Sequence, residues 1–179
     1  NRNGRLEGGF YDYVTVYSVE DNTDSEGEQR IYLNDASVRT TLQSALQEVT
    51  SEERALEIMN NVPINPSYES VMAFYYGAGL KIEEFEQLAD KLTTSEEETR
   101  PGLVNVNTAS KEVLLCLPDL EESDVESLLS YRQNQDDLDS VAWAAKVLDR
   151  EKAIAIGNYI TVRSFQYSAD IICLSGNGR

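Results

Sequence analysis

The sequence contains no histidine, and this absence removes the side chain most often used as a general base near neutral pH and as a transition-metal ligand. It also has no serine in the Gly-x-Ser-x-Gly pattern of a hydrolase nucleophile. Carboxylates are so frequent that no spacing singles out two acids placed across a cleft, as a glycoside hydrolase would need. Gly77-Ala78-Gly79 lacks the context of a phosphate-binding loop and is typical of a helix end. We therefore expect a protein without catalytic activity.

Basic residues are scarce, because 15 lysines and arginines stand against 32 aspartates and glutamates, for a net charge of -17. Binding to nucleic acid draws most of its affinity from basic side chains that neutralise phosphates, and the sequence has no basic stripe. The acidity favours solubility and raises the chance of cation binding. With 41% hydrophobic and 26% charged residues, the composition is that of a globular chain with one medium domain or two small ones.

Long apolar segments and cysteines are also rare. No apolar run is long enough to span a bilayer, and no signal peptide is present. The chain begins at Asn1 rather than at methionine, so we expect it to be a piece of a longer protein. Its only cysteines, Cys116 and Cys173, do not make a disulfide framework, and we expect both thiols to be buried. The alternative is a disulfide between their segments in an oxidising compartment.

The clearest motif is a short extended segment followed by two helices. The segment ends in four residues that define the motif: Asn105, Asn107, Thr108 and Ala109. Asn107 and Thr108 are good N-cap types for the apolar helix that follows. A second helix is predicted to start at Ser123, because Ser123 and Glu126 match a capping box. This order is typical of a helix-hairpin-helix unit, a module that binds DNA in some proteins and protein in others.

The same order appears earlier in the chain. Residues 31–37 align without a gap on residues 104–110, so that Asn34 and Ala36 correspond to Asn107 and Ala109. Continued without a gap, the alignment places residues 50–53 on the capping box that begins at Ser123. We interpret this pattern as a degenerate internal repeat of one hairpin unit. The alternative is a chance likeness between two capped helical hairpins.

The turns between the hairpin helices favour protein contact over DNA contact. A DNA-binding hairpin needs a glycine-rich turn whose backbone N–H groups approach a phosphate, with a helix N-terminus behind them. The turn at residues 117–123 contains no glycine and carries Asp119, Glu121 and Glu122, and the turn near residues 47–50 also lacks glycine. Carboxylates at this place would repel a phosphate, so no binding of nucleic acid is expected.

The two ends of the chain are predicted to form one antiparallel sheet around a helical insertion, which is an α+β fold. Residues 11–18 are aromatic and β-branched, and residues 158–164 and 165–174 are strand-like partners for them. The predicted parts are residues 1–29 with the first strand and an acidic loop, an inserted helical domain at 30–133, and residues 134–179 with an acidic loop, a short helix over 141–148 and the last strands. The insertion divides into a hairpin unit at 30–62, a helical pair at 67–93 with helices over 68–76 and 81–92, a polar linker at 93–101 and a hairpin unit at 103–133.

This order of motifs resembles the K-type minor pseudopilins of bacterial type II secretion systems, the general secretion pathway protein K family, over nearly the whole chain. The features that carry the resemblance are Tyr13-Val-Thr-Val-Tyr17, Leu92-Thr93, Val104-Asn-Val-Asn-Thr-Ala109, Leu117-Pro118, Tyr131-Arg132, Ser140-Val-Ala-Trp143, Ile160-Thr-Val-Arg-Ser164 and Ser168-Ala-Asp170. Competence-type DNA receptors share the Asn-x-Asn-Thr-Ala element, and the terminal strand pattern separates the two families. The family's glycine after Leu-Pro is Asp119 here, which is expected to reshape the turn.

The resemblance implies a small pilin-like sheet with a large inserted α-helical domain that contains the two hairpin units. It implies a non-catalytic structural component at the tip of a secretion pseudopilus, packed against other minor pseudopilins. It also implies a periplasmic domain whose full-length protein is anchored in the inner membrane by an N-terminal helix that is absent from this piece. The alternative is a helix-hairpin-helix module that binds DNA or another protein.

Two further groups of residues are candidates for a site. Members of the family can hold calcium in the helical domain, and calcium prefers several oxygen ligands from loops. Asp136, Asp137 and Asp139 are the first calcium candidates and residues 119–124 the second, although neither spacing matches an EF-hand and a solvated acidic loop is the alternative. Four aromatic residues are candidates for an interface patch, or else for core packing: Tyr68, Tyr75, Tyr76 and Trp143.

Overall fold

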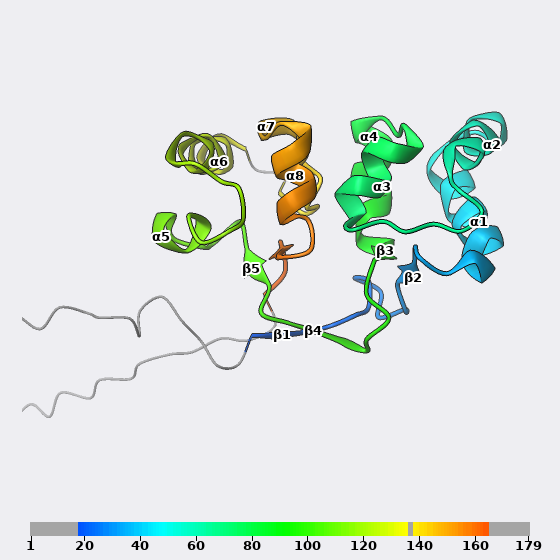
Figure 1. The fold of residues 1–179 in the computed structure, drawn as a ribbon, viewed down its shortest axis with the longest axis horizontal. Helices are drawn as coiled ribbons and strands as arrows, with labels where there is room; N and C mark the ends of the chain where they lie inside the picture. Colours follow the sequence, from blue (N-terminus) through cyan, green and yellow to red (C-terminus); the bar gives the residue numbers. More distant parts are fainter. Residues whose placement is uncertain (1–17, 136–137, 165–179) are drawn as a thin grey trace, which may run out of the picture.

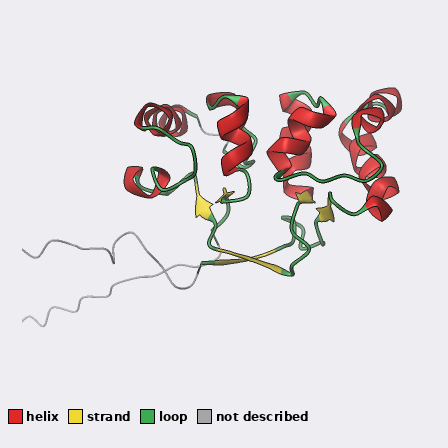
Figure 2. Cartoon of the chain, viewed as in Figure 1, coloured by secondary structure: helices red, strands yellow, loops and turns green. Residues whose placement is uncertain are grey.

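The computed structural model describes residues 18–135 and 138–164, which form two groups of helices side by side above a narrow two-stranded ribbon (Figure 1). We call residues 31–93 the first unit and residues 104–161 the second unit. Figure 2 shows that helices make up most of both units and that the strands are short. The chain is therefore a mixed α+β structure, as the sequence predicted at this coarse level.

The first unit begins and ends with a strand. Its elements in order are β2 (Ile31–Tyr32), η2 (Ala36–Val38), α1 (Arg39–Val49), α2 (Glu52–Asn61), α3 (Val71–Ala78), α4 (Ile82–Leu88), η3 (Ala89–Lys91) and β3 (Leu92–Thr93). Strands β2 and β3 pair in parallel, with Ile31 opposite Leu92. The two ends of the unit therefore lie side by side, and the four helices form the loop between them.

The second unit follows the same path. Its elements are β5 (Val104–Asn105), α5 (Lys111–Leu114), α6 (Glu122–Asn134), α7 (Trp143–Val147), α8 (Arg150–Ile156) and β6 (Ile160–Thr161). Strands β5 and β6 again pair in parallel, with Val104 opposite Ile160. Each predicted hairpin unit thus contains two helices at the predicted place, and in each case two more helices complete the unit.

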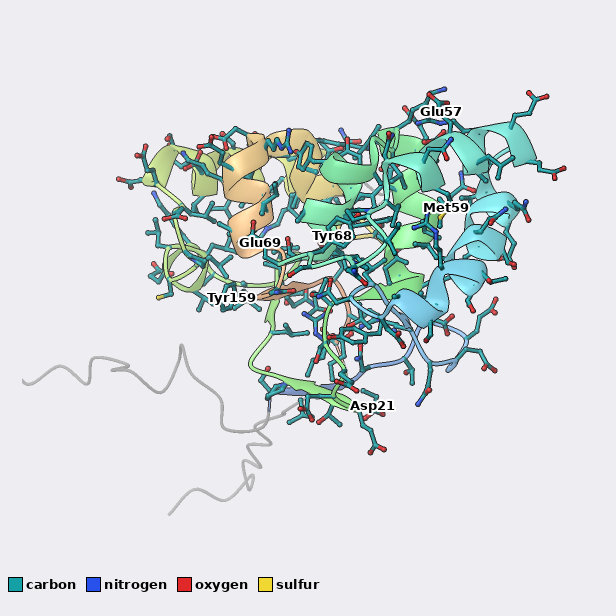
Figure 3. The ribbon with its side chains drawn as sticks, turned by 45° about the vertical axis from the view of Figure 1, so that its right-hand side comes forward. Asp21, Glu57, Met59, Tyr68, Glu69 and Tyr159 are labelled. Atoms are coloured by element: carbon teal, nitrogen blue, oxygen red, sulfur yellow. The ribbon has the colours of Figure 1, made fainter. Side chains whose placement is uncertain are left out.

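The ribbon below the units is antiparallel and joins two connecting segments. Strand β1 (Val19–Asp21) pairs with β4 (Thr99–Pro101), with Glu20 opposite Arg100. The segment before the first unit is thereby held against the segment between the units. Asp21 lies on this ribbon, on the side away from the helices (Figure 3).

The hydrophobic core runs without a break through both units. The largest fully buried side chains come from helices of both: Phe74, Phe85, Leu46 and Ile58 from the first unit, and Trp143, Leu114, Leu128 and Ile156 from the second. Burial of such side chains contributes about 1.5 to 3 kcal/mol each relative to exposure. The two units are therefore parts of one folded body.

Helices α3 and α8 form the joint between the units. The Ser70 hydroxyl donates to the Ile154 carbonyl at 2.9 Å, and the Asn158 amide donates to the Glu69 carbonyl. Gly157 is buried at this place, and a Cβ added to it would lie 2.8 Å from the Cβ of Ser70. An ion pair between Lys146 of α7 and Glu86 of α4 adds a second contact across the joint. Glycine at position 157 permits this close approach, because an added side chain would meet the side chains of Ser70 and Met72.

Several predicted elements differ from the observed ones. The predicted polar linker at 93–101 contains β4, and the acidic loop predicted to follow the first strand within residues 1–29 contains β1 and a bridge between Thr23 and Gln29. Both segments are ordered because they pair with each other or with themselves across the ribbon. Helix α8 was not predicted at all, since its Ile-Ala-Ile pattern is equally typical of a strand.

The predicted sheet of the two chain ends lies mainly outside the described residues, since it involves residues 11–17 and 165–174. Within the described residues, β1 pairs with β4, and β6 pairs with β5. Only two residues of the predicted strand at 158–164 form a strand, and its partner belongs to the second unit. The pilin-like arrangement stays a prediction. No helix among the described residues is both long enough and apolar enough to cross a membrane.

Candidate functional site

Asn34 and Asn107, which the repeat pattern aligned, form equivalent side-chain hydrogen bonds in the two units. The Asn34 amide donates to the Tyr68 carbonyl at 2.9 Å, and its oxygen accepts from the Tyr68 N–H at 2.6 Å. The Asn107 amide donates to the Leu138 carbonyl at 2.9 Å, and its oxygen accepts from the Trp143 indole at 3.0 Å. Each asparagine thereby ties the first strand of its unit to the segment before the third helix.

The other motif residues have local structural roles. The Asn105 oxygen accepts from the Asn107 N–H at 2.9 Å, and its amide donates to the Ser164 hydroxyl at 2.8 Å. The backbone N–H groups of Thr108 and Ala109 both donate to the Asn105 carbonyl. Ala36, the equivalent of Ala109, lies in η2. The motif therefore forms a folded turn at the start of each unit and holds no reactive group.

The predicted helix caps are displaced by one to three residues. Ser110, and neither Asn107 nor Thr108, accepts from the first turn of α5, because Asn107 is occupied by the contacts to Leu138 and Trp143. Helix α2 is capped by Ser51 rather than by Thr50, whose hydroxyl donates back to the Leu46 carbonyl.

The capping box predicted at Ser123 and Glu126 is also wrong. Helix α6 begins at Glu122, and the box is closed by Asp124, which accepts from the Glu121 N–H at 2.8 Å. Glu126 is instead engaged by Lys111 at 3.0 Å. The ion pair with Lys111 holds the carboxylate that the predicted cap required.

The turn between α5 and α6 contains a residue, Asp119, in the left-handed backbone conformation that glycine adopts readily. Asp119 has a φ of 58°, and it is the only non-glycine residue with positive φ in the described part of the chain. The left-handed region costs an L-residue about 1 to 2 kcal/mol, and aspartate tolerates it better than most. A glycine would adopt this conformation without strain. The expectation that Asp119 reshapes the turn relative to the family stays a prediction.

The same turn presents negative charge where a phosphate-binding hairpin presents N–H groups. Glu122 is paired with Lys111 at 2.6 Å and Asp124 with Lys152 at 2.7 Å, while Asp119 and Glu121 make no ion pair within the described part of the chain. The pKa of Asp124 is lowered by the hydrogen bond from Lys152 and by the Glu121 N–H, so its carboxylate stays ionised near neutral pH. A phosphate approaching this turn would meet carboxylates.

The calcium candidates are only partly visible. Asp136 and Asp137 lie outside the described residues, and Asp139 is exposed. In the second candidate region, residues 119–124, the carboxylates of Glu122 and Asp124 are engaged by lysines. Among residues 18–135 and 138–164, no group of three or more acidic, cysteine or histidine side chains lies close enough to hold a metal ion.

Cys116 is exposed, so the expectation of a buried thiol is wrong for this residue. Helix α5 ends at Leu114, and the chain turns so that Leu114 and Leu117 face the core while Cys116 faces outward. Cys173 lies outside the described residues, and a disulfide between the two stays untested.

The four aromatic candidates take part in ring contacts within the units. Trp143 is 1% exposed and stacks on Tyr131 with ring centres 5.5 Å apart. Tyr75 stacks on Phe85 at 4.7 Å. The remaining contacts are Tyr68 with Phe74, Tyr75 with Tyr76, and the guanidinium of Arg150 over the ring of Tyr76. These contacts favour core packing over an interface patch.

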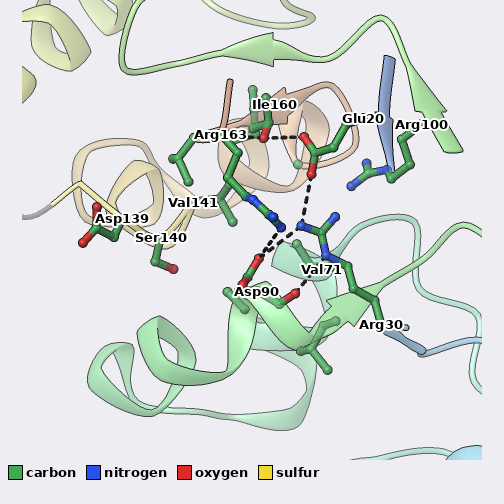
Figure 4. A pocket seen from close by; sticks show the side chains of 15 residues that line it. Glu20, Arg30, Val71, Asp90, Arg100, Asp139, Ser140, Val141, Ile160 and Arg163 are labelled. Atoms are coloured by element: carbon green, nitrogen blue, oxygen red, sulfur yellow. Dashed lines mark hydrogen bonds and ion pairs between the residues drawn. The ribbon is translucent and has the colours of Figure 1, made fainter. Parts of the chain in front are cut away.

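The main concentration of buried charge lies in the seam where the two units meet the ribbon (Figure 4). Glu20 of β1 is 4% exposed and accepts from Arg30 at 3.0 Å and from the Thr161 hydroxyl at 2.7 Å. Arg30 also donates to the carboxylate of Asp90 at 3.1 Å. Because buried ions cost free energy unless they are paired, this chain of contacts stabilises the seam only as a complete set.

Two more arginines border the same network. Arg163 donates to the carbonyls of Thr23 and Asp24 and lies 3.4 Å from Asp90. Arg100 donates to the Asn158 carbonyl at 3.1 Å. We call the space between these groups the seam cavity, and its volume is about 40 Å³. Its polar lining is Glu20, Arg30, Asp90, Arg100, Asp139, Ser140, Thr161 and Arg163.

Hydrogen bonds within the seam keep the carboxylate of Asp90 ionised. Burial by itself raises the pKa of Asp90, but hydrogen bonds from Ser25 and Arg30 outweigh it and leave the pKa below its ordinary value. Burial, with the nearby charge of Arg30, lowers the pKa of Arg100. A carboxylate held ionised by hydrogen bonds is a poor proton donor or acceptor near neutral pH. The seam therefore has the chemistry of a binding or tethering site.

The sequence pattern did not single out the seam residues. One signal was available: Arg30 directly precedes β2, and Arg100 and Arg163 lie within four residues of β5 and β6 in a chain poor in basic residues. The acids that meet these arginines lie far away in sequence, so only the folded chain brings them together.

Comparison of this chain with protein-family models, with curated proteins and with solved structures gives no match.

Proposed function

We propose that this chain is a non-catalytic structural component of a secretion pseudopilus, of the K-type minor pseudopilin class, and that it packs against other minor pseudopilins at the tip. The proposal includes a periplasmic location and, in the full-length protein, an N-terminal helix that anchors it in the inner membrane. The order of sequence motifs described above is its starting point.

The observation that carries the choice of protein contact over DNA contact is the turn around Asp119. Asp119 has a left-handed backbone conformation, which glycine adopts without strain. The carboxylates of this turn would repel the phosphate of a DNA ligand. A hairpin scaffold with an acidic turn suits a protein partner.

The joint between the units supports a structural role. Contacts between α3 and α8, the close approach at Gly157 and the continuous core make the two units one body. Units that are already packed against each other have less conformational freedom to lose when the chain joins an assembly.

The test is co-purification of this chain with the soluble domains of minor pseudopilins from the same bacterium. We expect a stable complex at micromolar concentration, seen by size-exclusion chromatography with light scattering. A parallel gel-shift assay with duplex DNA at low salt should show no shift. Absence of a complex together with salt-sensitive DNA binding would replace the proposal by the alternative, a helix-hairpin-helix module of the kind found in competence-type receptors.

A further inference from the structure

The seam cavity has an imbalance of charge. Two carboxylates, Glu20 and Asp90, face three guanidinium groups, those of Arg30, Arg100 and Arg163. A third acid, Asp139, also lines the cavity, but it is exposed and lies on the side opposite Arg100 (Figure 4). Solvent screens an exposed carboxylate strongly, so Asp139 compensates little of the buried positive charge.

The carboxylates of the buried Glu20 and the half-buried Asp90 are already engaged. One Glu20 oxygen accepts from Arg30 and the other from the Thr161 hydroxyl. One Asp90 oxygen accepts from Arg30 and the other from the Ser25 N–H at 2.8 Å. Among the described residues, every carboxylate oxygen of Glu20 and Asp90 at the inner wall of the cavity therefore accepts a hydrogen bond.

Of the three arginines that line the cavity, Arg100 is the one that forms no ion pair with a described carboxylate. A guanidinium has five N–H donors, and the one partner found for Arg100 in the described part of the chain is the neutral carbonyl of Asn158. The residue is half-buried, so its charge has lost part of its hydration. Glu20, opposite it in the β1–β4 pairing, attracts this charge but forms no ion pair with it. Burying a charge in this way is unfavourable unless an anion completes the site.

The size and charge of the cavity define the anion. A cavity needs about 10 to 15 Å³ in this measure for one water molecule, so about 40 Å³ holds a group of only a few heavy atoms. The excess of one positive charge matches a monoanion. A guanidinium binds a carboxylate through two parallel N–H donors, which is its preferred geometry.

We propose that the seam cavity binds a carboxylate group, with Arg100 as its principal partner and Arg30 and Arg163 on the wall behind it. The carboxylate comes either from a small free acid or from an aspartate or glutamate side chain of a protein partner. The site lies where the ribbon meets both units, so an occupant would link the segment at 18–24 to both. This inference stands apart from the proposed pseudopilin role.

The test uses the whole chain and NMR of the arginine Nε–H groups, titrated with sodium formate. Sodium benzenesulfonate at equal ionic strength is the control for general salt effects, because it is too large for the cavity. We expect the Arg100 signal to shift with saturation for formate and to stay unchanged for benzenesulfonate. The thermal midpoint should rise by about 3 to 6 °C at ten times the formate Kd. Shifts that do not saturate, or that are equal for both anions, would overturn the proposal.

Two variants assign the site. Arg100→Gln should abolish the saturable response to formate, while Arg150→Gln, which removes an arginine outside the cavity, should preserve it. If Arg100→Gln does not fold, Arg100→Lys serves instead, with an expected loss of at least tenfold in affinity because lysine lacks the two-pronged geometry. Retention of wild-type formate affinity in the Arg100 variant would refute the assignment.

A last arm distinguishes the two sources. A short capped peptide with one aspartate is compared with its asparagine counterpart and with formate. Tighter binding of the aspartate peptide than of formate assigns the site to a partner's side chain, and binding of formate alone assigns it to a small free acid. Either result supports the carboxylate site, whereas binding of neither contradicts it.

Discussion

The first and second units follow the same path with almost no sequence in common, and their differences show what the fold requires. Ser51 caps α2 where Glu121 caps α6, and the buried Ala55 and Ile58 of α2 correspond to Val125 and Leu128 of α6. The closing strands correspond as well, since the Thr93 and Thr161 carbonyls each accept a hydrogen bond at 2.9 Å from the residue that follows the first strand of their unit. Position and burial are kept, while residue identity is free to change.

One pair of contacts is kept with its charges exchanged. In the first unit, Arg54 of α2 pairs with Glu84 of α4 at 3.0 Å. In the second unit, Asp124 of α6 pairs with Lys152 of α8 at 2.7 Å. All four residues occupy the third position of their helix. In both units the acid also accepts from the N–H of its own N-cap residue, at Lys81 and at Glu121. The fold requires an ion pair here and is indifferent to its direction.

The largest expected effect comes from breaking this pair in one unit. Arg54→Asp places a second acid beside Glu84, and we expect it to lower the free energy of unfolding by about 3 kcal/mol. The double change Arg54→Asp with Glu84→Lys copies the arrangement of the second unit and should recover most of the loss. Urea denaturation of the four members of this cycle measures the coupling. A double variant no more stable than Arg54→Asp would show that the two pairs are not interchangeable.

The ion pairs Arg54–Glu84 and Asp124–Lys152 are expected to make the stability of both units depend on pH. The pKa of Glu84 is lowered mainly by the hydrogen bond from Arg54, and that of Asp124 mainly by Lys152. A carboxylate with a lowered folded-state pKa stabilises the protein above its ordinary pKa of about 4 to 4.5 and loses that contribution as the pH falls further. We expect the coupling energy of the cycle to be full at pH 7 and to shrink below about pH 4.

The two asparagines are expected to be equally important. Asn34→Ala and Asn107→Ala each remove two hydrogen bonds from a half-buried position, for an expected loss of about 2 kcal/mol. The sequence has a single tryptophan, Trp143, so the fluorescence of the folded state should change for Asn107→Ala and stay constant for Asn34→Ala. A tenfold difference in the two stability losses, in either direction, would break the equivalence.

A smaller effect is expected where the units differ at the joint. Gly157 occupies the place that Ala89 has in the first unit, and Gly157→Ala should cost about 1 to 2 kcal/mol because the new methyl group meets Ser70. The matched control is Gly77→Ala in α3, where the added Cβ lies 3.4 Å from the Tyr68 ring and helix propensity should add up to about 1 kcal/mol. Thermal unfolding of both variants measures the contrast. Equal stability of the two would show that the joint yields to the added methyl group.

The smallest expected effect is a gain. Asp119→Gly should raise the free energy of unfolding by about 0.5 kcal/mol, because glycine adopts positive φ without strain but loses more entropy on folding. Asp119→Ala retains the strain and loses the polar side chain, so it should lower stability by a similar amount. Chemical denaturation of the pair checks the sign, and a loss in the glycine variant would mean that the Asp119 side chain stabilises the turn.

The repeat shows how far sequence patterns reach in this chain. The alignment of residues 31–37 on 104–110 holds in the structure, since Asn34 and Asn107 make equivalent contacts. It fails beyond this point because α1 has 11 residues and α5 has four, so that Glu121, and not Ser123, is the counterpart of the α2 cap. This difference in helix length cannot be recognised in the sequence, because the two units share the pattern of buried positions but not the residue types.

The seam lay beyond sequence reasoning for a different reason. Glu20, Asp90 and Arg163 come from three segments that meet only after both units have folded. Local periodicity carries no information on such contacts, and composition showed only that arginines were few. The candidate carboxylate site could therefore be found only from the tertiary structure, whereas the hairpin motif could be predicted from the sequence.

The parallel strands that close each unit also determine how the chain would carry mechanical load. The chain enters the first unit through Ile31 and leaves it through Thr93, from strands that run in the same direction. Tension applied at these two ends would pull the strands past each other along their length, and would load the hydrogen bond from Leu33 to Thr93 together with its neighbours in shear. Shear strains such bonds simultaneously, whereas peeling breaks them in turn. The pair of parallel strands at the base of each unit is thus expected to resist stretching. Force spectroscopy with handles at positions 30 and 94 would measure the force needed to separate the strands of the first unit.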